Sequence, residues 1–205
     1  MNKFNFNQLD DMQFDVLKEI GNIGAGNATT ALSQLLNSKI DMNVPKVQLI
    51  DIGELSDIMG GPEVLSVGVL LTISDDVEGM IMFMLEQKSA HYLVNILMGK
   101  QIDEMNEFSE MDLSALKEIG NIITGAYLSS LSSLTNLKIA ASIPYVAVDM
   151  AGAVLSVPAI EFGKLGDKSL LIQSQFLEDE KEVNGYFILI PTEDSYNKIL
   201  SSLGL

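Results

Sequence analysis

The chain has 205 residues, of which 47% are hydrophobic and 6% aromatic, so it can bury a sizeable core of aliphatic and methionine side chains. Its 28 acidic and 12 basic residues give a formal charge of −16, which argues against nucleic acids and anionic membranes, because both are bound mainly through Lys and Arg. The absence of cysteine and the single histidine exclude a thiol nucleophile, a disulfide framework and a Cys/His zinc set.

The sequence contains no membrane-targeting signal. No apolar run approaches the roughly 18 residues that a membrane span requires. The first residues, MNKFNFNQLDD, lack the charged start and long apolar stretch of a signal peptide. We therefore expect a cytoplasmic protein without membrane insertion.

The first half begins with a predicted long helix, roughly residues 8–38, in which apolar residues recur every three or four positions. Three strand-like segments follow: VQLID, LSVGVLLTI and GMIMFML. Met80, Met82 and Met84 alternate along the third segment, and we expect them to fill the core. EQKSAHYLVNILMG is predicted to close this half as an amphipathic helix ending at a glycine, with His91 partly exposed.

The second half repeats this order of elements. Its long helix is expected to begin at Ser109, because Asp112 stands three residues later, as in a capping box. YVAVD, SLLIQSQF and YFILI are the strand-like segments, and TEDSYNKILSSLG is the closing helix. The short hairpin connections predict antiparallel pairing of the strands.

The two halves also share sequence. LKEIGNI occurs at residues 17–23 and again at 116–122, an offset of 99 residues, and EVLSVGVL (63–70) matches AVLSVPAI (153–160) at an offset of 90. We therefore predict one α/β (α+β) domain, residues 1–205, made of two repeats, about 8–99 and about 109–204. The predicted fold has an internal pseudo-twofold relation and a mostly antiparallel sheet with the long motif helices packed on it.

The repeated stretch places polar residues on one helix face. Within an arc of roughly 60°, the first helix carries Asp15, Glu19, Asn22 and Gly26. The corresponding positions of the second helix are Ser114, Glu118, Asn121 and Gly125. Glycine within a helix costs about 1 kcal/mol relative to alanine, so its repetition indicates close approach by another backbone. Retention of duplicated packing is the alternative explanation.

Glu and Asn on an open helix do not make a hydrolase by themselves, since no nucleophile, metal cage or buried acid pair accompanies them. They can, however, complete a site on a partner. A carboxamide both donates and accepts, so it can hold a water in line with a phosphoryl group, and a carboxylate can bind a cation of the partner.

The spacing [Asp or Ser]-x3-Glu-x2-Asn-x22-Pro resembles the signature of the CheC/CheX/FliY family of phosphatases in bacterial chemotaxis. Asp15, Glu19, Asn22 and Pro45 match it, with 22 residues between Asn22 and Pro45. The second match consists of Ser114, Glu118, Asn121 and Pro144, with the same separation. Two motifs favour the CheC branch, because CheX resembles a dimer with one motif per chain, and we accordingly expect a monomer.

The resemblance implies dephosphorylation of phosphorylated CheY. Asn22 and Asn121 would orient the attacking water, and Glu19 and Glu118 would contact a lysine of the regulator. The chain would bind no cofactor or metal of its own, because the Mg²⁺ and the phosphorylated Asp belong to CheY. Flagellar switch proteins are further candidate partners.

The resemblance also implies binding to CheD, a receptor-modifying deamidase, through a short helix after the second proline. That segment is VDMAGAVLS, with Asp149 as the polar residue to test. A simple connection between two strands is the alternative.

Two other functions compete with catalysis. GAGNAT (24–29) is glycine-rich like a nucleotide cradle, but a dinucleotide fingerprint follows a strand and opens a helix, whereas these glycines lie within a predicted helix. The stronger alternative is a non-catalytic adaptor that binds phosphorylated CheY, CheD or flagellar switch proteins. Catalysis below stoichiometric amounts would distinguish an enzyme from such an adaptor.

Overall fold

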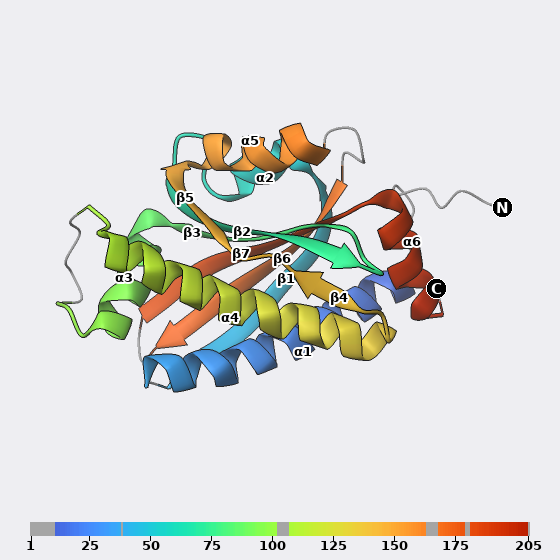
Figure 1. Cartoon of the computed structure of the whole chain (residues 1–205), viewed down its shortest axis with the longest axis horizontal. Coiled ribbons are helices and arrows are strands. Elements are labelled where there is room, and N and C mark those ends of the chain that lie inside the picture. The colour runs from blue at the N-terminus through green and yellow to red at the C-terminus, as the bar shows by residue number, and fades with distance from the viewer. Residues whose placement is uncertain (1–10, 38, 102–106, 163–167, 179–180, 205) are drawn as a thin grey trace.

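A seven-stranded antiparallel sheet runs through the computed structural model, with helices on both faces (Figure 1). The structure describes residues 11–37, 39–101, 107–162, 168–178 and 181–204. Its elements in chain order are α1 (Asp11–Leu36), β1 (Asp41–Asp51), the 3-10 helix η1 (Ile52–Glu54), α2 (Leu55–Ile58), β2 (Leu65–Asp75), β3 (Gly79–Glu86), α3 (Gln87–Met98), α4 (Glu110–Thr135), β4 (Ile139–Ala141), β5 (Tyr145–Met150), α5 (Ala151–Phe162), β6 (Lys168–Glu178), β7 (Lys181–Pro191) and α6 (Glu193–Ser202).

The predicted fold class is confirmed. Every strand segment expected from the sequence is a strand, and all strand pairs are antiparallel. Within the predicted 8–38 helix, α1 covers residues 11–36, whereas positions 8–10 and 38 lie outside the described residues. The predicted glycine at the end of the first closing helix is also confirmed, since Gly99 caps α3 with a φ of 62°.

The core lies on both faces of the sheet, whose strand order is β1-β6-β7-β3-β2-β4, with β5 also paired to β2. Alternate residues of β3 separate the two clusters. Ile81, Phe83 and Leu85 belong to the larger one, together with residues of α1 and α4. The methionines of β3 belong to the smaller one, with residues of α2 and α5, and are at most 4% exposed. Their predicted core-filling role is therefore confirmed.

The two halves follow a similar order of elements: a long helix, strand structure, a further helix, a hairpin and a closing helix. The strand structure after the long helix is the single strand β1 in the first half and the two strands β4 and β5 in the second. Their predicted pseudo-twofold relation stays a prediction. The proposed match between EVLSVGVL and AVLSVPAI is wrong, because residues 65–70 belong to strand β2 and residues 153–160 to helix α5. The two segments pack on each other instead, and a Cβ added at Gly68 would lie 2.5 Å from Val154 Cγ1. A short apolar run is compatible with a strand or with a buried helix, so the similarity of the two sequences did not indicate the same secondary structure.

The expected partial exposure of His91 is also wrong. His91 is 4% exposed, and its ring stacks on Phe108 with the ring centroids 3.9 Å apart. Phe108 stands just before α4, and its ring covers His91 on α3. Helical periodicity within α3 gives no sign of a cover supplied by another part of the chain.

Candidate functional site: two exposed helix faces

The polar stripe predicted on α1 lies on the surface. Asp15, Glu19, Asn22 and Gly26 are all exposed. The side chains of Asp15, Glu19 and Asn22 make no hydrogen bond or ion pair with any residue that the structure describes. Such groups are hydrated in the free protein, so they can exchange water for groups on a partner.

The stripe on α4 has the same character. Ser114, Glu118, Asn121 and Gly125 are exposed, and within the described parts of the chain the three side chains of this set have no hydrogen-bond partner or counter-ion. Both Asn residues occupy the twelfth position of a 26-residue helix, counted from Asp11 and Glu110. The structure thus presents two similar sets of polar groups on two similar helices.

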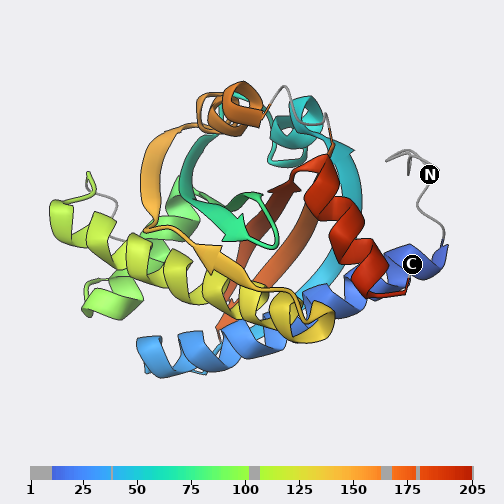
Figure 2. The ribbon, with the colours of Figure 1, turned by 45° about the vertical axis from the view of Figure 1, so that its right-hand side comes forward.

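The two helices pack side by side and run in opposite directions on one face of the sheet (Figures 1 and 2). The Tyr127 ring lies against Gly24, and Asn27 Nδ2 donates a hydrogen bond to Ser130 Oγ at 3.0 Å. At about 100° per residue, Asn22 lies roughly 200° around α1 from Gly24. The α1 stripe therefore points away from α4.

The α4 stripe points away from α1 by the same reasoning. Asn121 and Gly125 lie roughly 120° and 160° around α4 from Tyr127, the residue that contacts Gly24 of α1. The two stripes consequently lie on opposite flanks of the helix pair, and the two sets of polar residues are not brought together into one site.

Glycines within the repeated motif serve two purposes. Gly21 and Gly120 are buried, and a Cβ added at Gly120 would lie 2.6 Å from Val69 Cγ1 of β2. By contrast, a Cβ at Gly26 or Gly125 would lie more than 4 Å from every described atom apart from its chain neighbours and the nearby backbone of its own helix. Packing against β2 explains Gly120, and Gly21 is likewise buried. The exposed pair, one turn after each Asn, has no packing contact in the described part of the chain that would require glycine.

The motif prolines lie on the strands next to these helices. Pro45 belongs to β1, where the pairing with β6 shifts register between Asn43 and Lys46; its side chain lies outside the described residues. Pro144 stands between β4 and β5 and is half-buried. Proline has no N–H for a strand ladder, so it suits such interruptions. Because α1 packs on β1 and α4 on β4 and β5, each proline shapes the strand beside one motif helix.

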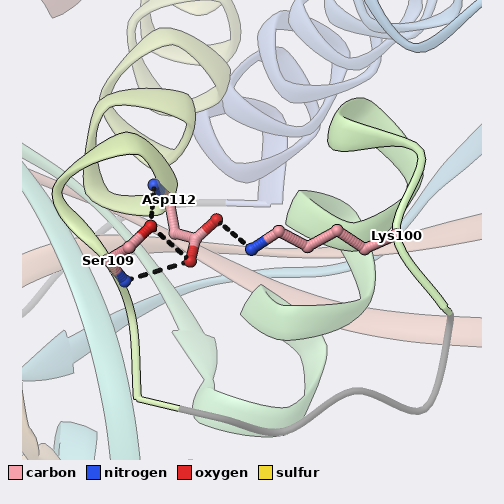
Figure 3. A network of polar contacts seen from close by, with 3 residues as sticks. All are labelled: Lys100, Ser109 and Asp112. Carbon is pink, nitrogen blue, oxygen red and sulfur yellow. Dashed lines mark hydrogen bonds and ion pairs between the residues drawn. The ribbon is translucent and has the colours of Figure 1, made fainter.

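The start of α4 is anchored by a polar network (Figure 3). The predicted capping box is confirmed: Asp112 N donates to Ser109 Oγ at 3.3 Å, and Ser109 N donates to Asp112 Oδ2 at 3.0 Å. Lys100 Nζ, which the sequence did not indicate, lies 2.6 Å from Asp112 Oδ1. The only sequence feature that could have drawn attention to Lys100 is its position directly after Gly99, the glycine that ends α3.

The same network controls the protonation of Asp112. Burial acts to raise the pKa of this carboxyl, but hydrogen bonds from Lys100 and Ser109 and the charge of Lys100 outweigh it. The pKa of Asp112 therefore lies below its ordinary value of 3.8. The first turn of the motif helix thus contains an ionised carboxylate that accepts hydrogen bonds from Ser109 N, Ser109 Oγ and Lys100 Nζ.

Asp149 lies at the end of β5, next to α5. It is exposed, and its Oδ1 accepts a hydrogen bond from the Met150 backbone N–H at 2.7 Å. The segment after it is a 12-residue helix, not a simple strand connection. Two apolar residues of α5 that the sequence did not single out are also exposed: Val157 by 38% and Ile160 by 76%.

Other kinds of site receive no support in the described ranges. GAGNAT lies inside α1, as expected, and does not follow a strand as a nucleotide cradle would. No group of three or more His, Asp or Glu side chains within the described residues converges on a possible metal position. None of the helices in that part of the chain combines the length and apolar character needed to cross a bilayer.

Comparison with known proteins places this geometry in a family. The model of the CheC-like family matches residues 12–49, and that of the chemotaxis phosphatase CheX matches residues 67–159. The CheY-P phosphatase CheC of Bacillus subtilis is 35% identical over 203 residues, covering 97% of each chain. The chain therefore belongs to the CheC-like family.

Solved structures share the fold at lower identity. FliY from Thermotoga maritima superimposes with a TM-score of 0.77 at 23% identity, covering 96% of this chain and 98% of that chain. A chain of the CheX–CheY–BeF3–Mg²⁺ complex from Borrelia burgdorferi superimposes with a TM-score of 0.51 at 18% identity, covering 84% of this chain and 96% of that chain. These likenesses concern the fold alone.

Proposed function

We propose that this protein dephosphorylates the aspartyl phosphate of a CheY-type response regulator, using Asn22 and Asn121 to orient the attacking water. The observation that carries this proposal is that each motif helix exposes a Glu and an Asn whose side chains have no partner among the residues that the structure describes. A glycine with open space around it follows each Asn one turn later. The name of the B. subtilis relative, a CheY-P phosphatase, supports the choice of substrate.

In the proposed reaction this chain contributes one carboxamide at each site. The carboxamide of Asn22 or Asn121 accepts a hydrogen bond from the water and, with its N–H, donates to the phosphoryl group, so the water lies in line with the scissile bond. The water oxygen attacks phosphorus and the bond to the aspartyl oxygen breaks. Inorganic phosphate leaves and the carboxylate of the regulator is restored.

The carboxylates position the regulator. Glu19 and Glu118 stand one turn before each Asn and are exposed, so each can bind a lysine of the regulator through a charge-assisted hydrogen bond. Mg²⁺ and the phosphorylated Asp are supplied by the regulator. Asp15 and Ser114 occupy the first motif position and have a supporting role. The exposed glycines let the regulator backbone approach each helix closely.

Turnover at low enzyme concentration tests the proposal. Phosphate release would be followed with phosphorylated CheY in large molar excess over this protein. We expect many phosphates released per chain and decay faster than that of CheY alone. An adaptor that only holds phosphorylated CheY, CheD or flagellar switch proteins would change the decay in proportion to its own concentration, and that result would contradict the enzymatic proposal.

We also propose that CheD binds at α5 and Asp149. The support is the exposed helix with its apolar Val157 and Ile160 next to an exposed carboxylate. Asp149→Lys should weaken CheD binding in a calorimetric titration, whereas Glu193→Lys on α6, equally an exposed acid reversed in charge, should not. Equal affinity of both variants for CheD would exclude Asp149 from the contact.

A further inference from the structure

A groove of about 360 Å³ lies directly beyond the Asn121 stripe, between α4 and β4. Gly125, the last residue of that stripe, lines its near end. Ser129 and Ser132 continue along the same side of α4, four and seven residues after Gly125, and Ile139 and Ala141 of β4 form the opposite wall. Asn121 and the α4 residues that line the groove therefore lie along one side of the helix, with Gly125 common to the stripe and the groove.

The groove is open to solvent, and one of the hydroxyl groups that line it is available for a hydrogen bond. Ser129 and Ala141 are exposed, and the Ser129 side chain has no hydrogen-bond partner in the described part of the chain. Ser132 Oγ, in contrast, is engaged, donating to the Leu137 carbonyl oxygen at 2.6 Å. The buried Leu128 lies at the base. An apolar base with a free hydroxyl at the rim suits a side chain with an apolar stem and a polar end.

Two small residues that line the groove have larger counterparts in the first half of the sequence. Moving back by the 99-residue offset, Ser129 corresponds to Thr30 and Ala141 to Met42 in the sequence. Both replacements add volume. Small residues at these two positions therefore distinguish the Asn121 flank from the Asn22 flank.

We infer that this groove is a docking subsite for the phosphorylated response regulator, receiving one of its surface side chains while Asn121 reaches the phosphoryl group. The inference rests on the proposed function. Continuity with the motif face favours the regulator over any other occupant, because a molecule in contact with Asn121 and Gly125 covers the mouth of the groove. The subsite contributes to binding and takes no part in the chemical step.

The test uses a chain in which only the second site works. In an Asn22→Ala parent, Ser129→Phe fills the groove from the helix, and Ala141→Phe fills it from the strand. Both positions are exposed, so the fold should persist, as thermal melting would verify. Each variant should raise the KM for phosphorylated CheY about fivefold or more while kcat at saturation stays nearly unchanged.

The matched control is Thr30→Phe in the same parent. It places the same side chain at the corresponding exposed position of α1, on the disabled flank, and should leave KM at its parental value. An unchanged KM in both groove variants, or an equal rise in the control, would overturn the subsite. Failure of the Asn22→Ala parent to turn over would instead contradict catalysis at Asn121, so the two failures are distinguishable.

Discussion

At the scale of single residues, the motif divides into groups that the fold needs and groups that it does not. Gly120 is needed, because Val69 occupies the space that a side chain would take. Asn121 and Gly125, a few residues along the same helix, make no contact with the described residues that would require an amide or a glycine there. Interaction with a partner protein is the physical explanation for residues such as Asn121 and Gly125, which the fold itself does not require.

This division predicts opposite effects for one substitution at two glycines of α4. Gly125→Ala should raise the free energy of unfolding by up to about 1 kcal/mol, because the methyl group meets open space and alanine favours helix. Gly120→Ala should lower it, because displacing Val69 costs roughly 1–3 kcal/mol. Urea denaturation of the two variants measures both effects. Equal stabilities would show that β2 yields easily and that Gly120 is not a packing residue.

Gly125→Ala should also affect the rate at which CheY is dephosphorylated. A variant that is more stable than wild type but poorer in dephosphorylating CheY would show that the open glycine is kept for close approach of the regulator. The rate would be compared in an Asn22→Ala background, where the second site is the sole contributor. Full activity there would mean that the regulator backbone stays clear of position 125.

At the scale of elements, the start of α4 depends on one ionised carboxylate. The pKa of Asp112 is lower in the folded chain than its ordinary value of 3.8, so the unfolded chain takes up the proton first as the pH falls. The contribution of Asp112 to stability is therefore complete above the ordinary value and is lost as the pH falls through the lower folded pKa.

Asp112→Asn should accordingly be less stable than wild type at neutral pH, and the difference should shrink in acid. Thermal melts between about pH 7 and pH 2 measure this convergence. Glu107→Gln, which changes an exposed acid just before α4, is the control and should track wild type throughout. A constant gap between Asp112→Asn and wild type at every pH would mean that shape, not charge, is what Asp112 contributes.

At the scale of the whole molecule, opposite flanks for the two stripes predict two independent docking events. CheY held in a stable phosphoryl-like state with beryllofluoride should bind with two molecules per chain, and Glu19→Lys should reduce the stoichiometry to one. Sedimentation velocity distinguishes these complexes by mass. A single regulator per wild-type chain would contradict the arrangement of the two flanks.

The sequence predicted most of this architecture because its signals were local. Helix periodicity, the capping box at Ser109 and the alternating methionines of β3 each depend on neighbouring residues, and each was confirmed. The errors arose where distant segments meet. The cover of Phe108 over His91 and the packing of α5 on Gly68 depend on tertiary contacts that no local pattern records.

For the candidate site, the sequence located the exposed stripes but not their directions. Those depend on the contacts of Gly24 with Tyr127 and of Asn27 with Ser130, which link residues about 100 positions apart. The groove beside β4 was missed because it too depends on packing between elements. The Lys100 anchor was missed because its ion pair with Asp112, 12 residues later, depends on how the ends of α3 and α4 meet. A polar pattern on a helix tells which residues share a face, whereas the packed neighbours decide where that face points.

The central claim is that the two exposed amides carry the reaction independently, and the kinetics of Asn22→Ala, Asn121→Ala and the double variant test it most directly. Each single variant should keep part of the CheY dephosphorylation rate, and the double variant should lose about 100-fold or more while still binding beryllofluoride-treated CheY. Substantial activity of the double variant, with binding intact, would show that neither amide orients the attacking water.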